Sequence, residues 1–204
     1  MTVLQFSHDD LSKKLSSLPR RLRTAFAAAC AQRLMPAYAA SASRNLNANP
    51  QQAIKILTEL WNDIQCGSSD PSKLKRDVEI CETLIPDHDG SYFDGFEHAD
   101  NATCSLAYAV ESELKGGAEE AAWAAERCFE SLFHAVKNTF GDGRSPAEMA
   151  RILSVPLIQA ELRRQAADLA DLQLAAKNPG SEAAIIARIR RRADADSEFF
   201  FRLP

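Results

Sequence analysis

The chain has 204 residues, of which 46% are hydrophobic and 25% charged, and its formal net charge is −4. This composition is ordinary for a globular protein. A chain this long buries roughly 70% of the surface that its unfolded form exposes, so we expect a fold that needs no disulfide staples. The mildly acidic balance, with a sequence pI of about 5.6, argues against broad electrostatic binding to nucleic acid or anionic lipid.

The first part of the chain predicts a short helix followed by a long one. The short helix runs from residue 9 or 10 to about residue 17, and the long one begins at Pro19. Pro36 falls inside the apolar pattern of the long helix. We expect it to kink or divide that helix, because proline removes one backbone hydrogen bond and crowds the preceding turn. The polar residues 44–49 then predict a loop.

The next two helices each start at a capping residue followed at once by proline, Asn49-Pro50 and Asp70-Pro71. The side-chain oxygen of the capping residue accepts a hydrogen bond from a backbone N–H of the first turn. Proline suits the following position because it has no N–H to leave unpaired. Residues 67–69 end the first of these helices, Pro86 ends the second, and residues 87–95 form a polar loop.

The second half of the chain carries the same signals. One helix starts near Phe96 and ends at Gly116-Gly117, and the next carries the heaviest aromatic stripe in the sequence. After a turn at residues 141–143, the pair Ser145-Pro146 starts a long helical region that reaches about residue 177. The pair Asn178-Pro179 starts the last helix.

These elements predict an all-α fold. Pro156 is expected to interrupt the long helical region, and no linker, composition shift or fixed repeat divides the chain. We therefore expect a single domain of residues 1–204 with about seven or eight helices, packed as a mostly antiparallel bundle. Residues 1–18 would hold the short N-terminal helix, and residues 194–204 an apolar C-terminal tail.

The sequence predicts a cytoplasmic protein that has no membrane span. Its first residues lack the basic start and apolar core of a secretory signal. No apolar run approaches the roughly 18–20 residues that cross a bilayer. The cysteines are expected to be reduced, because their number is odd and no C-x-x-C pair occurs. Most are expected to be buried, because they stand among apolar residues on predicted helices. They are Cys30, Cys66, Cys81, Cys104 and Cys128.

Four stretches form an ordered set. They are Phe26-Ala-Ala-Ala-Cys30-Ala-Gln-Arg33-Leu34-Met-Pro36-Ala-Tyr38, Leu57-Thr-Glu-Leu60-Trp61, Ile85-Pro86 with Ala99-Asp-Asn101-Ala102 and Leu106, and Pro156-x-x-Gln159-x-Glu161. In this order they resemble the YjaG-like family of bacterial proteins of unknown function, over about residues 20–192. The resemblance implies an all-helical cytoplasmic protein and carries over no catalytic or binding residue. That family has an aspartate where this chain has Asn101.

Residues 87–100 hold the densest group of polar side chains, with two histidines and five carboxylates. Such residues can ligate a divalent metal. His88, Asp94 and His98 are the candidate ligands of a metal-dependent enzyme in which a carboxylate is the general base. The simpler interpretation is that the acidic residues form turns and helix caps. An EF-hand does not fit, because Tyr92 stands where the turn glycine belongs.

Two arginine clusters lie near helix ends. They are Arg20, Arg21 and Arg23 at the start of the long early helix, and Arg188, Arg190, Arg191 and Arg192 in the last one. If both clusters lay on one surface, the protein would be a nucleic-acid-associated factor. The acidic pI and the lack of a reading motif make nucleic acid an unexpected partner.

The C-terminal tail contains Phe199, Phe200 and Phe201 in succession. Three consecutive rings cannot all face one side of a helix, and left in water they would form an aggregation-prone patch. They are expected to pack on their own domain or on a second copy of the chain, which would make a homo-oligomer.

No catalytic motif emerges, so the sequence assigns no catalytic residue, no cofactor site and no metal ligand. A pairing of Cys30, Cys66 or Cys104 with a distant histidine stays open. His134 is expected to be a hydrogen-bonded histidine at the edge of the core, and Trp61 and Trp123 are expected to be core residues. The preferred function is a non-enzymatic helical protein-interaction module, an adaptor or regulator, with an unidentified protein partner.

Overall fold

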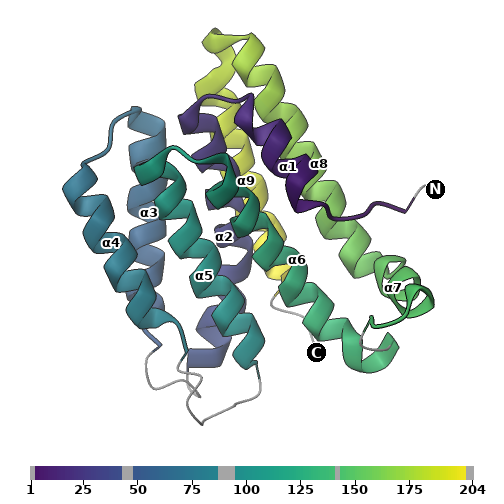
Figure 1. Ribbon diagram of the computed structural model, residues 1–204. Coiled ribbons are helices and arrows are strands. Elements are labelled where there is room, and N and C mark those ends of the chain that lie inside the picture. Colours follow the sequence, from purple (N-terminus) through teal and green to yellow (C-terminus); the bar gives the residue numbers. More distant parts are fainter. Residues whose placement is uncertain (1–2, 43–47, 87–94, 141–142, 201–204) are drawn as a thin grey trace.

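Helices make up every regular element of the residues that this computed structural model describes, which are 3–42, 48–86, 95–140 and 143–200 (Figure 1). They are α1 (His8–Ser16), α2 (Arg20–Ser41), α3 (Pro50–Cys66), α4 (Pro71–Leu84), α5 (Phe96–Lys115), α6 (Ala118–Phe140), α7 (Pro146–Leu153), α8 (Pro156–Lys177), the 3-10 turn η2 (Pro179–Ser181) and α9 (Glu182–Phe200). The predicted all-α class is confirmed. The predicted interruption at Pro156 divides α7 from α8, which brings the described α-helices to nine.

Three of the four predicted caps form. The side chain of Asn49 accepts from Gln52 N at 3.1 Å and that of Asp70 from Ser72 N at 2.8 Å. Ser145 Oγ accepts from Glu148 N, and the Glu148 carboxylate accepts from Ser145 N, both at 3.2 Å. This reciprocal pair is a capping box that satisfies two backbone donors at the start of α7.

The fourth predicted cap, Asn178, is wrong. Asn178 Nδ2 donates to the carbonyl of Leu174 at 3.1 Å, and its backbone N–H donates to the same carbonyl. Asn178 therefore ends α8 and does not cap the next helix. Residues Pro179–Ser181 form a 3-10 turn, and α9 begins only at Glu182.

Pro36 does not divide α2, which is assigned as one helix from Arg20 to Ser41. The missing backbone bond weakens this turn. However, α2 packs against α3, α5, α6, α8 and α9, and burial on so many sides holds the helix together. Tertiary packing here outweighs a local helix breaker.

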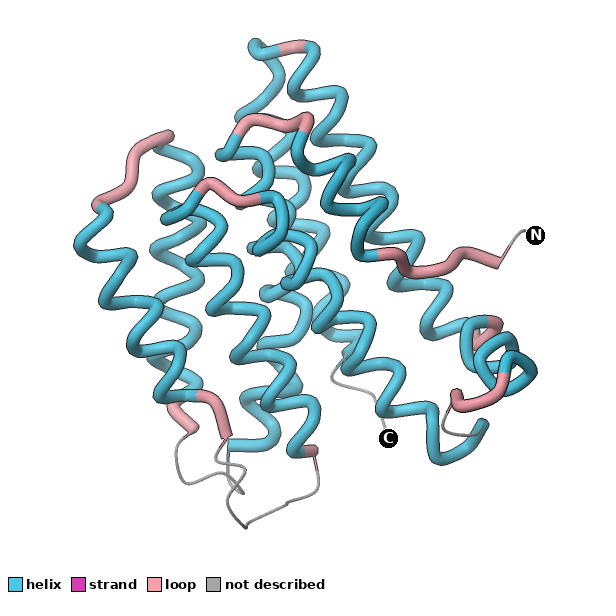
Figure 2. The backbone as a smooth tube through the Cα atoms, viewed as in Figure 1, coloured by secondary structure: helices cyan, strands magenta, loops and turns pink. Residues whose placement is uncertain are grey.

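The helices lie side by side around α2 and are joined mostly by short loops (Figure 2). α4 packs on α5 at one edge, and α1 packs on α6 at the other. Small side chains let neighbouring helices approach α2 closely. Those that are 0% exposed include Ala25, Ala27, Ala28, Ala29 and Ala31. The hydrophobic core contains residues from Leu15 in α1 to Ala193 in α9.

Within the described ranges, no helix combines the length and the apolar character that crossing a bilayer requires.

Candidate functional site

The segment before α1 is not helical and lies across α8 (Figure 1). Leu4 N donates to Gln159 Oε1 at 2.9 Å, and Gln159 Nε2 donates to Leu4 O at 2.8 Å. One side-chain amide on α8 therefore pairs with both backbone groups of one residue, as a neighbouring β-strand would. Gln159 is 6% exposed and also donates to the carbonyl of Leu153 at 2.8 Å, which fixes its orientation.

The same segment is also held by an aromatic contact and by a histidine. The ring of Phe6 stacks on Phe129 of α6, with centroids 5.3 Å apart and an interplanar angle of 11°. Both ring nitrogens of His8 contact carboxylates, Glu119 at 2.8 Å and Glu126 at 2.9 Å. Burial alone lowers the pKa of His8, but the two carboxylates outweigh it and the pKa lies above its usual value. The protonated ring can donate to both partners at once.

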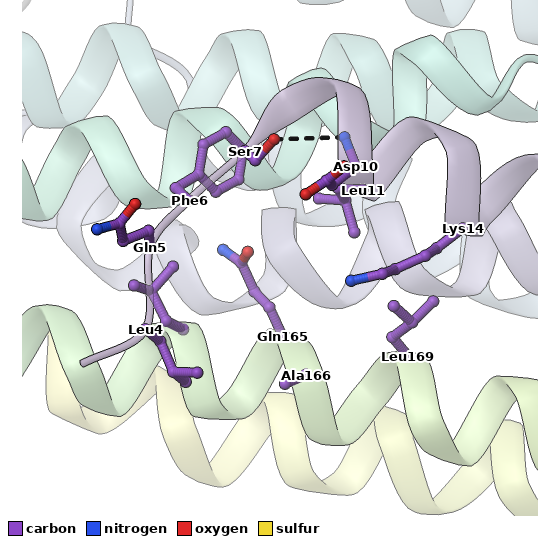
Figure 3. A pocket seen from close by; sticks show the side chains of 11 residues that line it. Leu4, Gln5, Phe6, Ser7, Asp10, Leu11, Lys14, Gln165, Ala166 and Leu169 are labelled. Carbon is purple, nitrogen blue, oxygen red and sulfur yellow. Dashed lines mark hydrogen bonds between the residues drawn. The ribbon is translucent and has the colours of Figure 1, made fainter. Parts of the chain in front are cut away.

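A pocket of about 180 Å³ lies beside this segment, with residues 4–7 and α1 on one side and α8 on the other (Figure 3). Its apolar lining consists of Leu4, Phe6, Leu11, Leu162, Ala166 and Leu169. Its polar lining consists of Gln5 and Ser7 before α1, Asp10 and Lys14 from α1, and Gln165 from α8. The arrangement suits a ligand that is largely apolar and carries a few polar atoms.

Gln165 connects the pocket to the protein interior. Its Nε2 donates to Glu161 Oε1 at 3.0 Å and to the carbonyl of Ala125 at 3.1 Å. Because a carbonyl only accepts, the NH₂ group must face Ala125 and the amide oxygen must lie on the other side. Figure 3 shows this amide at the floor of the pocket.

Beneath the pocket, α8 is tied to α2 by a buried charge network. Arg33 donates to Asp168 Oδ2 at 2.9 Å and to Glu161 Oε1 at 3.0 Å, and none of the three side chains is more than 2% exposed. Arg192 of α9 contacts the other oxygen of Asp168. The charges therefore balance in pairs, as buried ions require.

Burial and the ion pairs together shift the pKa values of Glu161 and Arg33. Burial raises the pKa of Glu161, and Arg33 opposes that rise without cancelling it. Burial lowers the pKa of Arg33, but Glu161 and Asp168 contribute more in the other direction, and the pKa stands well above its usual value. The network is closed to solvent, so we assign it the role of positioning α8 and Gln165.

Two motifs that carry the family resemblance meet at this network. Cys30 and Arg33 come from the first motif, and Gln159 and Glu161 come from the last. Arg33 also donates to Cys30 Sγ at 3.3 Å. The sequence analysis named these residues but did not place them together, because 128 positions separate Arg33 from Glu161.

Of the three candidate metal ligands, only His98 belongs to the described residues. His88 and Asp94 lie outside the described residues. His98 Nδ1 is 2.7 Å from Ser131 Oγ of α6. Among the described residues, no group of three or more histidine, cysteine, aspartate or glutamate side chains could hold a metal ion.

Each of the two arginine clusters contains residues that form ion pairs with carboxylates of this chain. Arg21 pairs with Glu182 at 2.6 Å and donates to the carbonyls of Ile64 and Gln65 at the end of α3. Arg188 pairs with Asp171 at 2.7 Å. These contacts tie α2 to α3 and α9, and α9 to α8, and they favour the structural interpretation of the arginines.

Of the two tryptophans that were predicted to lie in the core, one is buried and the other is not. Trp61 is 0% exposed, as predicted, and Arg190 lies 5.8 Å from its ring centroid. Trp123 is 36% exposed, so its assignment to the core is wrong. Its ring contacts Tyr108 and His8 at the surface, where a tryptophan keeps one face in water.

His134 lies at the edge of the core, as predicted. It is half-buried, and its Nδ1 accepts from Lys137 Nζ at 2.7 Å. Burial and the nearby ammonium hold the pKa of His134 below its usual value.

Cys81, Cys104 and Cys128 are not activated thiols. Burial raises the pKa of Cys104 to about 11 and that of Cys81 to about 12, and it raises the pKa of Cys128 well above the usual range. These groups are neutral thiols near pH 7, and a neutral thiol is a poor nucleophile. Cys30, Cys81 and Cys128 are buried, as expected for most of the cysteines, and Cys66 is exposed.

The predicted aromatic contact of the tail cannot be placed, because Phe201 and the side chains of Phe199 and Phe200 lie outside the described residues.

The pocket residues Lys14 and Gln165 were not singled out in the sequence. A lysine and a glutamine on amphipathic helices carry no motif, so no signal distinguished them from solvated surface.

Comparisons with known proteins identify a family but no activity. The model of a family described as "Protein of unknown function (DUF416)" matches residues 10–197. The crystal structure of a DUF416 family protein from Shewanella baltica is similar, with a TM-score of 0.74 and 16% identity, over 89% of this chain and 92% of that chain. At this identity the likeness shows the fold alone. No curated protein matches the sequence.

Proposed function

Given that this chain belongs to the DUF416 family of proteins of unknown function, we propose that it is a non-enzymatic helical interaction module. It acts as an adaptor or regulator in the bacterial cytoplasm and belongs to the YjaG-like proteins within that family. Its docking surface is the face of α6 and α8 beneath residues 3–7. Its partner presents an extended peptide with apolar side chains at alternate positions.

The observation that carries the proposal is the pairing of Gln159 with Leu4. A side-chain amide that binds the N–H and the C=O of one residue recognises extended backbone and not a particular side chain. The chain places its own segment there. The resident contacts therefore describe what a partner segment would need to offer.

The side chains around Gln159 set the pattern of the partner. Leu4 and Phe6 stand two residues apart and both pack against the core, since alternate side chains of an extended segment share one face. Phe6 stacks on Phe129, whose ring lies 6.1 Å from that of Phe133. A peptide with a leucine-like residue followed two positions later by an aromatic one fits this surface.

The test uses the full chain and a fluorescent hexapeptide with the sequence of residues 3–8, Val-Leu-Gln-Phe-Ser-His. In the natural chain the resident segment competes with the probe at a high effective concentration. The double variant Leu4→Gly/Phe6→Gly weakens the resident segment and leaves the docking surface unchanged. We expect this variant to bind the probe about tenfold more tightly than the natural chain, as measured by fluorescence anisotropy.

Two controls make the result specific. A hexapeptide with glycine in place of leucine and phenylalanine should not bind, and adding Gln159→Leu to the double variant should abolish binding of the probe. Circular dichroism confirms that each variant keeps its helices. The proposal fails if the double variant binds the probe no better than the natural chain, or binds both hexapeptides equally.

A further inference from the structure

The pocket between α1 and α8 stays open while residues 3–7 occupy their own surface, and residues 4–7 form one of its walls. In Figure 3, Lys14 and Gln165 reach toward one another across it from opposite elements. Leu11 lies on the α1 side, and Ala166 and Leu169 lie on the α8 side. The cavity thus has a polar centre and apolar walls.

The amide oxygen of Gln165 is a hydrogen-bond acceptor on the pocket side of the side chain. The side chain is only 5% exposed, and the amide donates through Nε2 to Ala125 and Glu161, so Oε1 is left to face the pocket. It accepts no hydrogen bond from any described residue. Water in the pocket can donate to this oxygen, and a ligand with an N–H group can take the place of that water.

Two side chains of opposite charge also line the pocket. Lys14 and Asp10 come from successive turns of α1, and neither forms an ion pair within the part of the chain that the structure describes. Most lysines and aspartates at a surface are simply solvated. Here, however, an ammonium, a carboxylate and an amide oxygen line the same small cavity.

The size of the cavity limits the ligand. An engineered cavity of about 150 Å³ holds benzene, so the pocket of about 180 Å³ holds one apolar group of similar size with a few further atoms. Leu162 and Leu169 provide the apolar surface for that group. The pocket is partly open to solvent, so a longer ligand would extend out of it.

We propose that this pocket binds a free α-amino acid with an apolar side chain, such as leucine or phenylalanine. Its carboxylate accepts from Lys14, and its ammonium group donates to Gln165 Oε1 and faces the carboxylate of Asp10. Its side chain packs against Leu162 and Leu169. This ligand complements Lys14, Gln165 and Asp10 at once, and a purely apolar molecule would leave them without a ligand partner.

The first test is a titration of the natural full chain, labelled with ¹⁵N, with L-leucine. We expect saturable shifts of the Gln165 side-chain amide and of the backbone amides of Leu11 and Leu169. Two analogues of the same size separate the polar contacts. Leucinamide lacks the carboxylate, and 4-methylpentanoate lacks the ammonium group. 4-Methylpentanoate should bind about tenfold more weakly, because it has no N–H group to donate to the Gln165 amide oxygen.

Matched variants locate the site. Ala166→Leu fills the cavity and should abolish the shifts. Ala167→Leu makes the same change at an exposed neighbouring position that does not line the cavity, so it should bind leucine like the natural chain. Lys14→Gln should weaken leucine about two- to fivefold, as expected for an exposed charge pair, and should leave the affinity for leucinamide unchanged.

Several results would overturn this inference: no saturable shifts with leucine or phenylalanine, equal binding of leucine and 4-methylpentanoate, or undiminished binding by Ala166→Leu. The inference stands apart from the peptide-docking proposal, since it is tested on the natural chain with small ligands. If the hexapeptide does not bind but leucine does, the peptide-docking proposal is refuted and the amino-acid pocket stands. If the hexapeptide binds but leucine does not, the amino-acid pocket is refuted and the peptide-docking proposal stands.

Discussion

Arg33→Met removes the central cation of the buried charge network. Arg33 is 1% exposed and contacts Glu161 at 3.0 Å and Asp168 at 2.9 Å. Methionine keeps much of the side-chain volume but leaves Glu161 without its cation, whereas Asp168 keeps Arg192. Breaking a buried ion pair from one side costs about 3–5 kcal/mol. We expect a loss of about 3 kcal/mol in the free energy of unfolding at pH 7, the lower end of that range, because one carboxylate stays paired.

The size of this loss depends on pH, because Glu161 can relieve its unpaired charge by binding a proton. Burial already raises the pKa of Glu161, and removing Arg33 raises it further. A carboxyl group whose folded pKa lies above its unfolded value, about 4.3 for glutamate, destabilises the fold as the pH rises from the unfolded value through the folded one. The deficit of the variant relative to the natural chain should therefore grow as the pH rises from the folded pKa of Glu161 in the natural chain toward the higher folded pKa in the variant.

Urea unfolding followed by far-ultraviolet circular dichroism, repeated at several pH values, measures both effects. Arg163→Met, on the exposed face of α8, is the matched control and should change the free energy of unfolding by less than about 0.5 kcal/mol. The double variant Arg33→Met/Glu161→Gln removes the unpaired charge and should regain about 2 kcal/mol of the loss. A loss below about 1 kcal/mol, a loss that is the same at every pH, or a double variant less stable than the single one would refute this reasoning.

Three further predictions concern the N-terminal segment and α7. The His8 imidazolium stabilises the docking of α1 on α6; its folded pKa is raised, so this contribution is full below about pH 6.5 and is lost as the pH rises through the folded value. His8→Gln should flatten that part of the stability profile, and an NMR titration of His8 that gives an ordinary pKa would contradict the prediction. Ser145→Ala removes the capping box of α7 and should cost about 1 kcal/mol in urea unfolding, and no measurable loss would show that this cap is unimportant. Saturating L-leucine should tighten hexapeptide binding to the Leu4→Gly/Phe6→Gly variant, because residues 4–7 form one wall of the pocket, the bound peptide restores that wall, and linked sites affect each other reciprocally; an unchanged affinity would show that the two sites are independent.

Local chemistry explains why most helix boundaries could be predicted. A cap such as Asn49, Asp70 or Ser145 acts on backbone groups two or three residues away, and the apolar rhythm of a helix is visible within two turns. Asn178 shows the limit of this approach. The same side chain can serve the end of one helix or the start of the next, and the sequence does not say which set of backbone groups it will contact.

By itself, the sequence determined the all-helical class and where most helices start, because capping and periodicity depend on near neighbours. Only the tertiary structure decided that α2 continues through Pro36, that Trp123 lies at the surface and that Arg33 meets Glu161 and Asp168. It also brought Lys14 and Gln165 to one cavity. Such contacts join residues more than a hundred positions apart, and their formation depends on how whole helices pack together, which a local pattern does not specify.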